Sequence, residues 1–151
     1  MRVALGCDHG GFPLKAELSK LLAEHGHELI DCGTDSADPV DYPRFASKVA
    51  KALLDGSAER GIVLCGSGVG AAVASNKVKG IRAGLCHDTY SAHQGVEHDD
   101  INVLCLGARV VGPSLAKEIV VAFLNARFSG KERHVRRLQL IDELEGKGKP
   151  L

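Results

Sequence analysis

The chain lacks several features that would point to particular classes of protein. Lysine plus arginine equals aspartate plus glutamate, at 19 each in 151 residues, so no charge excess favours a nucleic acid or a membrane surface as partner. No apolar run reaches the roughly 20 residues that a membrane-spanning helix needs, and the N-terminus turns acidic too soon for a signal peptide. We therefore expect a soluble cytoplasmic protein that binds neither nucleic acid nor membrane.

The cysteines also lack the patterns of a disulfide framework or a zinc ribbon. There are five, an odd number, and no two form a C-x-x-C pair. Cys7, Cys32, Cys65, Cys86 and Cys105 all fall in or beside apolar runs, where a reduced cysteine commonly acts as a small buried side chain. We interpret four of them in this way and single out Cys65, because a glycine-rich segment follows it.

The common nucleotide-binding and phosphatase motifs are absent. The glycines of Gly66–Gly70 have neither the spacing nor the place of a dinucleotide fingerprint, and no Walker phosphate loop occurs. A cysteine phosphatase loop is excluded because Ala71 stands where it would need an arginine. A nucleotide-binding protein stays a weaker alternative, through the glycine pair at 10–11 and the acidic Asp31 at the end of the second apolar run.

The apolar runs that are present predict a parallel sheet. They are continuous, without period-2 alternation, and such runs are typical of strands buried on both faces. They fall at residues 2–7, 28–32, 61–65, 81–86 and 101–107. Helical patterns lie between them, at residues 13–25, 42–55 and 113–127, with another beginning near Ala71. This alternation predicts a single domain over residues 1–151, a Rossmann-like three-layer α/β/α sandwich with a five-stranded parallel sheet.

An extra C-terminal helix is expected at about 131–145. Val135, Leu138, Ile141 and Leu144 follow one another at spacings of three, which indicates an apolar face. Since the sheet is already complete, we expect this face to pack on a neighbouring subunit of a homo-oligomer, a dimer or a tetramer. Residues 146–150 are expected to form a frayed tail.

Polar side chains gather where the predicted strands end, which is where ligands bind to an open parallel sheet. They occur in the segments Cys7–Gly11, Asp41–Tyr42, Cys65–Gly70 and His87–Tyr90, and in His98–Asp100 before the fifth run. The glycines of Gly66–Gly70 let main-chain N–H groups converge on one point at a helix N-terminus, which predicts an anion site. The positive electrostatic field at this helix N-terminus favours the thiolate form of Cys65, which can then act as a nucleophile or a base.

Several side chains have both a functional and a structural interpretation. Arg133 and Arg137 share a helix face and suit phosphate oxygens, although a solvated basic face is the plainer interpretation. His9 and His98 each adjoin an acidic residue that can orient an imidazole for proton transfer, or they are structural histidines. A metal site is a minor alternative; it would draw on Asp8, His9, His87, Asp88, His98, Asp99 and Asp100.

The order of motifs resembles ribose-5-phosphate isomerase B and its relatives, the allose- and galactose-6-phosphate isomerases. The resemblance extends from residue 1 to about 145. It is carried by the segments Gly6–Gly11, Asp41–Pro43, Ile62–Gly70, Ala74–Lys77, Gly80–Ala83, Glu97–Asp99, Asn102–Leu104 and Gly107–Gly112, and by Arg133, His134 and Arg137. The Cys-Gly-Ser-Gly block and the Asp-His-Gly start make it specific.

The resemblance implies an aldose–ketose isomerase that acts on a sugar phosphate through an enediolate, without metal or cofactor. Cys65 would remove the proton from C2, Ser67 would assist between O1 and O2, and His98 would open the sugar ring. Active sites in this family lie between subunits. The implied substrate-binding residues are Asp8, His9, Tyr42, Gly66, Gly68, Val69, Gly70, Asp99, Arg109, Arg133 and Arg137, of which His9 and the three arginines would hold the phosphate.

Two positions depart from common family patterns. Asp99 replaces an asparagine found in many members, which leaves the sugar preference open. Ala71 stands where some members carry a glutamate base, so the sequence favours the subtype with a cysteine base. Besides ribose 5-phosphate, a hexose 6-phosphate remains an alternative substrate, and a non-catalytic sugar-phosphate-binding protein is a less favoured alternative.

Overall fold

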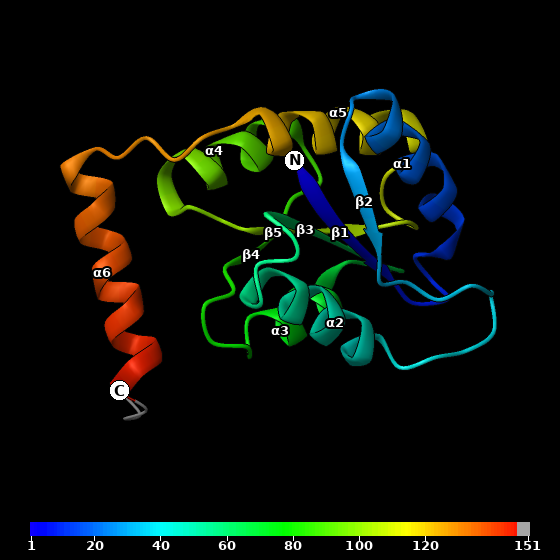
Figure 1. Cartoon of the computed structure of the whole chain (residues 1–151), viewed down its shortest axis with the longest axis horizontal. Helices are drawn as coiled ribbons and strands as arrows, with labels where there is room; N and C mark the ends of the chain where they lie inside the picture. Colours follow the sequence, from blue (N-terminus) through cyan, green and yellow to red (C-terminus); the bar gives the residue numbers. More distant parts are fainter. Residues whose placement is uncertain (148–151) are drawn as a thin grey trace.

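A computed structural model describes residues 1–147 and shows one parallel sheet with helices on both faces (Figure 1). The strands are β1 (Arg2–Cys7), β2 (Glu28–Asp31), β3 (Arg60–Cys65), β4 (Ala83–Leu85) and β5 (Val103–Gly107). The helices are α1 (Phe12–Glu24), α2 (Tyr42–Leu54), α3 (Val69–Ser75), α4 (Thr89–Asp99), α5 (Pro113–Asn125) and α6 (Glu132–Lys147). The predicted three-layer α/β class is confirmed. Of the tail predicted at 146–150, residues 146–147 continue α6 and the rest lies outside the described residues.

Strand alternation divides the core into two layers. On β3, Ile62 and Leu64 belong to the cluster that packs on α1, α4 and α5. Val63 and Cys65 point to the other face, which α2 and α3 cover (Figure 1). Both faces of the sheet are covered by helices and buried, which explains why the strands appear in the sequence as continuous apolar runs.

The strand order is β2-β1-β3-β5-β4, with every neighbouring pair parallel. From β1 the chain goes outward to β2 and then returns to the other side of β1 to form β3. Adjacent connections therefore leave the sheet in opposite directions at β1 and β3. This arrangement is a topological switch point, where open α/β sheets bind their ligands.

The last two strands are shorter than the sequence predicts. The run at 81–86 forms a strand only over Ala83–Leu85, and the run at 101–107 begins its strand at Val103. Asp100 adopts a left-handed backbone with φ of 47°, and the side chain of Asn102 accepts the N–H of Arg82 at 2.9 Å. Turn geometry therefore replaces strand pairing at the start of both runs, although Ile81 and Ile101 are buried.

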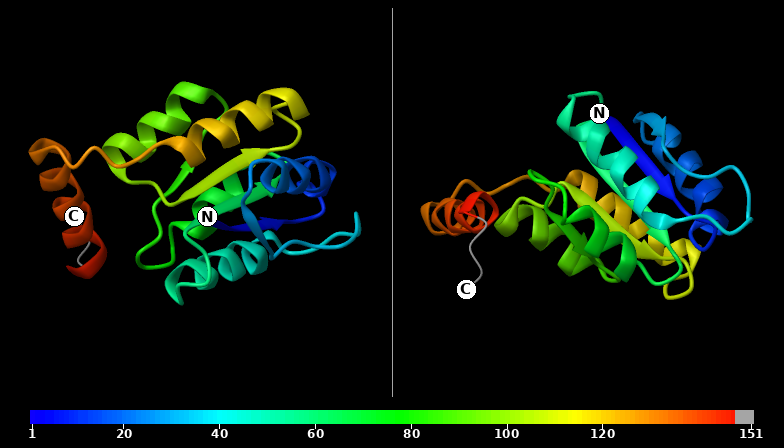
Figure 2. Two further views of the ribbon diagram at one scale, coloured as in Figure 1. Left: turned by 45° about the horizontal axis from the view of Figure 1, so that its top comes forward. Right: turned by 90° about the horizontal axis from the view of Figure 1, so that it is seen from below.

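Helix α6 stands to one side of the sheet (Figures 1 and 2). Its contacts with the rest of the chain are made with α4 and with the loop before β4, where the N–H of Gly80 donates to Glu145 at 2.8 Å. Leu140 and Leu144 on this helix are 54% and 64% exposed. Among the described helices, none combines the length and apolarity needed to cross a membrane.

Candidate active site

The loops that follow β1 and β3 meet at the switch point. The N–H of Asp8 donates to Leu64 O at 3.2 Å, which continues the β1–β3 pairing beyond the strand. Gly11 lies so close to β3 that an added Cβ would be 2.4 Å from the same oxygen. Only glycine fits such an approach of two main chains. The first turn of α1 is thereby fixed beside Cys65.

Asp8 forms the floor of this junction and is 6% exposed. Its Oδ1 accepts the N–H of Gly11 at 2.8 Å, and its carbonyl accepts the N–H of Phe12 at 2.9 Å. The carboxylate therefore holds the turn that leads into α1 as well as facing the pocket described below. The structural use of Asp8 depends on the main-chain N–H of Gly11 and so becomes visible only in the fold.

Cys65 ends β3 and is 5% exposed. Its Sγ accepts the N–H of Gly68 at 2.9 Å, which stabilises negative charge on sulfur. Gly68 has φ of 79°, a left-handed backbone that turns the chain tightly enough for this contact. Helix α3 then begins at Val69, two residues before the start that the sequence suggests, so the glycine loop and the first turn of the helix overlap.

The loop leaves main-chain donors for a ligand. Within residues 1–147, the N–H groups of Ser67 and Gly70 make no hydrogen bond. The N–H of Val69 is used locally, because it donates to Ser67 Oγ at 3.3 Å. The N–H of Gly68 donates to Cys65 Sγ. Of the N–H groups named here, one therefore binds the sulfur, one binds the serine, and those of Ser67 and Gly70 remain for a ligand in the pocket.

Three further side chains surround the loop. The ring of Tyr42, at the start of α2, packs on Gly70, whose added Cβ would lie 2.9 Å from it. Arg109 lies over Gly66, and a Cβ added to Gly66 would be 3.4 Å from the Nε of Arg109. His9 accepts the N–H of Val40 on Nδ1 at 3.2 Å, and the neutral ring then carries its proton on Nε2.

These residues line an open pocket of about 340 Å³. Its lining is Asp8, His9, Gly10, Tyr42, Cys65, Gly66, Ser67, Gly70, Arg109 and Val110. Eight of the predicted site residues are thus brought together. Gly68 and Val69 do not line the pocket, and their N–H groups donate to Cys65 and Ser67.

The surroundings of the other four cysteines favour the protonated thiol. Burial raises the pKa of Cys86 to about 11 and that of Cys105 to about 12, and burial also raises the pKa of Cys7 and Cys32. These four thiols stay protonated at neutral pH and pack as small apolar groups. The interpretation of four cysteines as structural agrees with this environment.

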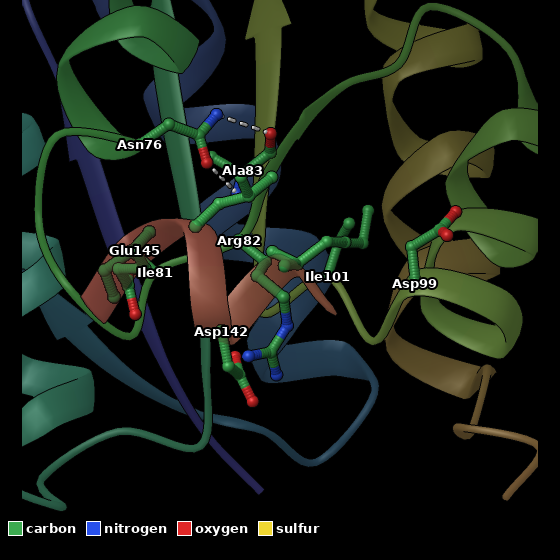
Figure 3. Close-up of a pocket in the computed structure, with 10 residues that line it drawn as sticks. Asn76, Ile81, Arg82, Ala83, Asp99, Ile101, Asp142 and Glu145 are labelled. Atoms are coloured by element: carbon green, nitrogen blue, oxygen red, sulfur yellow. Dashed lines mark hydrogen bonds between the residues drawn. The ribbon is translucent and has the colours of Figure 1, made fainter. Parts of the chain in front are cut away.

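A second group of predicted residues lies elsewhere on the chain. His98 is the penultimate residue of α4, on the amino-terminal side of β5, although the sequence argument placed it with the strand-end residues. Asp99 lines a separate cavity of about 390 Å³ between α6 and the start of β4 (Figure 3). Arg133 and Arg137 are exposed on α6. None of these four residues lines the Cys65 pocket of its own chain.

His134 links α4 to α6; the sequence analysis named it as part of the resemblance but gave it no role. It is 1% exposed, and its ring lies 4.2 Å from that of His98, centroid to centroid. Its Nδ1 is 2.6 Å from Ser129 Oγ, while Gln94 contacts His98 Nδ1 at 2.7 Å. Burial, followed by the charge of His98 and of the nearby arginines, lowers the pKa of His134. The apolar spacing of this helix gave no sign of a buried imidazole.

Sequence reasoning also missed Lys15. Its ammonium group is 2.8 Å from Asp31 and 3.0 Å from Asp35, and it donates to Thr34 O at 2.9 Å. A lysine on an amphipathic helix is usually solvated, so no local signal distinguishes it. It ties α1 to the loop between β2 and α2, which includes Val40, the partner of His9. Among the described residues, no three His, Cys, Asp or Glu side chains are grouped to hold a metal ion.

Comparison with known proteins agrees with this geometry. The model of the Ribose/Galactose Isomerase family matches residues 3–141. The ribose-5-phosphate isomerase B of Escherichia coli is 49% identical over 95% of this chain and 96% of its own. A structure of ribose-5-phosphate isomerase B from Clostridium thermocellum superposes with a TM-score of 0.96, at 48% identity over 99% of this chain and 100% of that one.

Relatives named for other sugar phosphates are also similar. A D-erythrulose-4-phosphate isomerase of Pectobacterium atrosepticum is 43% identical over 86% of both chains. The galactose-6-phosphate isomerase subunit LacB of Clostridium acetobutylicum is 37% identical over 95% of this chain and 83% of its own. The resemblance drawn from the motifs is confirmed, and the chain therefore belongs to the Ribose/Galactose Isomerase family and is an isomerase.

Proposed function

We propose that the chain interconverts ribose 5-phosphate and ribulose 5-phosphate, with Cys65 as the base. The observation that carries this proposal is the position of the Cys65 sulfur, which accepts the N–H of Gly68 at 2.9 Å. It lies next to the segment Gly66–Gly70, here called the donor loop, in a pocket that His9 and Arg109 also line. The E. coli and C. thermocellum relatives, similar over nearly their whole length, are named for this substrate.

The reaction can be written with the residues present. The Cys65 thiolate takes the proton from C2 of the open-chain aldose, and the electron pair forms the C1–C2 double bond of an enediolate. The Ser67 hydroxyl would pass a proton from O2 to O1. The thiol then returns its proton to C1, which leaves a ketone at C2 and regenerates the thiolate.

The donor loop would supply most of the catalytic effect. A proton beside a carbonyl carbon is weakly acidic, so the barrier depends on how well the enediolate oxygens are stabilised. The unused N–H groups of Ser67 and Gly70 are fixed before substrate arrives, and fixed donors need no reorganisation during the reaction. His9, through Nε2–H, and Arg109 would hold the phosphate at the other end of the pocket.

We further propose that a second copy of the chain completes each site in a homo-oligomer. His98, Arg133 and Arg137 lie away from the Cys65 pocket, so one chain alone does not bring all the proposed groups together. The exposed Leu140 and Leu144 give α6 an apolar surface that a second copy would cover. In a two-fold dimer each pocket would receive His98 and the α6 arginines of the partner.

The activity is tested by following ribose 5-phosphate in D₂O by NMR, with EDTA present and allose 6-phosphate in parallel. We expect ribulose 5-phosphate to form and deuterium to enter at the exchanging carbon, because the proton on sulfur can exchange with solvent. If only allose 6-phosphate were converted, the proposed substrate would be a hexose phosphate and not ribose 5-phosphate. Absence of turnover with both sugars would refute the proposal for these substrates.

The shared site is tested by mixing two inactive variants, Cys65→Ala and His98→Ala, after reversible dissociation. In a dimer with shared sites, each mixed dimer has one pocket with both residues intact. Random pairing should then restore about a quarter of the native activity. Sites contained in a single chain would give no recovery, and this result would contradict the proposed second-copy contribution.

A further inference from the structure

His87 follows β4 and does not line the Cys65 pocket. Its Nε2 accepts the N–H of Gly107 at 3.0 Å. The β4–β5 pairing covers only Ala83–Leu85, and one further bond joins Cys86 N to Cys105 O, so the ladder has ended before Gly107. The imidazole therefore pairs a main-chain donor that the sheet itself leaves unpaired.

Gly107 in turn supports the donor loop. An added Cβ on Gly107 would lie 2.5 Å from the carbonyl carbon of Ser67, and one on Gly68 would lie 3.0 Å from Gly107 N. The two main chains are thus in contact without an intervening side chain. The carbonyl of Gly107 is also used, because it accepts the N–H groups of Val110 and Val111. A shift of Gly107 would consequently move the loop that carries Ser67.

Arg109 is anchored separately. The N–H of Ala108 donates to Cys65 O at 2.9 Å, and the N–H of Arg109 donates to Gly66 O at 3.0 Å. These two bonds do not involve His87. Loss of the imidazole should therefore affect the position of Ser67 and Gly68 more than that of the phosphate-binding guanidinium.

We propose that His87 is a positioning residue for the isomerisation. By holding the N–H of Gly107 it keeps Ser67 and Gly68 against the end of β5, with the unused N–H groups of the loop aimed into the pocket. Because Nε2 is the acceptor, the neutral ring carries its proton on Nδ1. This inference rests on the proposed function of the Cys65 pocket.

The test compares His87→Leu, His87→Gln and the native chain in ribose 5-phosphate turnover. We expect His87→Leu to lower kcat about fivefold, the effect of one lost hydrogen bond, with KM within about twofold of native. Glutamine can place its Oε1 near the position of Nε2, so His87→Gln should recover most of kcat. His93→Leu, on the exposed side of α4, is the matched control and should leave kcat unchanged.

A second measurement does not depend on activity. Long-range ¹H–¹⁵N spectra of the native chain should show His87 protonated on Nδ1, and the Gly107 amide should shift in His87→Leu and return towards its native position in His87→Gln. Native kcat in His87→Leu, equal kcat in both variants, or an Nε2–H tautomer would overturn the inference. If the native chain fails to turn over the sugar, the proposed function fails, while the tautomer and amide shift still decide whether His87 holds Gly107.

Discussion

The predicted site residues lie in two regions, which differ in how they are held. We call the carboxyl ends of the strands the carboxyl edge and the surface of α4 and α6 the helix edge. At the carboxyl edge, Asp8, Cys65 and Ser67 sit on loops joined by main-chain hydrogen bonds and by glycines in direct contact. On the side of α4 and α6, His98 and Arg137 are side chains on helix surfaces. The proposed proton-transfer groups therefore lie together in one chain, with His9 and Arg109 in the same pocket, whereas His98 and Arg137 lie outside that pocket.

The largest expected effect comes from removing the proposed base at the carboxyl edge. Cys65→Ala should lower kcat for ribose 5-phosphate about 10³-fold, because general-base catalysis typically contributes two to four orders of magnitude. Initial rates measured beside Cys32→Ala, a half-buried cysteine outside the pocket, provide the comparison. Retention of kcat within tenfold of native would assign the base to another residue.

The next effect tests the helix edge. Arg137→Ala should raise KM about tenfold with little change in kcat, if the phosphate is held equally in the ground and transition states. Arg136→Ala, an exposed arginine on the same helix, is the control and should leave KM near native. Equal effects of both substitutions would indicate a general charge effect in place of a specific phosphate contact.

A smaller effect concerns how the carboxyl edge is held together. Lys15→Met should lower the free energy of unfolding by about 1 kcal/mol, since it removes two ion pairs with solvent-exposed partners and one hydrogen bond to Thr34 O. Urea unfolding, with Lys20→Met as the solvated control on α1, measures the difference. The idea that this lysine restrains the loop before Tyr42 would be dropped if both variants had the same midpoint.

The smallest expected effect is a pH dependence at the helix edge. Because burial lowers the pKa of His134 in the folded chain, the unfolded chain binds more protons between that lowered value and the ordinary value of 6.5. Stability should therefore rise with pH through this window and fall as pH drops below about 6.5. The charged groups that also lower this pKa are His98, Arg133, Arg137 and Lys131.

Thermal unfolding between pH 5 and pH 7.5 measures this dependence. His134→Gln should show a flatter change of Tm with pH than the native chain, and His93→Gln should keep the native slope. A native slope in His134→Gln would assign the acid sensitivity to other groups.

Periodicity predicted most of the elements and some of the bounds. The first strand at 2–7 and the helix at 42–55 agree with β1 and α2 to within one residue, because Pro43 and Gly56 fix where the helix can begin and end. The starts of β4 and β5 were missed, because the turns at Asp100 and Asn102 depend on contacts with Arg82 from another segment. Local patterns do not contain such contacts.

The sequence by itself determined the α/β class and the family and singled out the segment from Cys65 to Gly70 as a candidate site, since these follow from local order, glycine spacing and motif succession. The tertiary structure alone decided the strand order, which brings the loops after β1 and β3 together and sends His98 to the other side of the chain. It also decided the contacts of Lys15 and His87 and the burial of His134. Their partners lie in distant segments, and a side chain acquires a role of this kind only when folding supplies the partner.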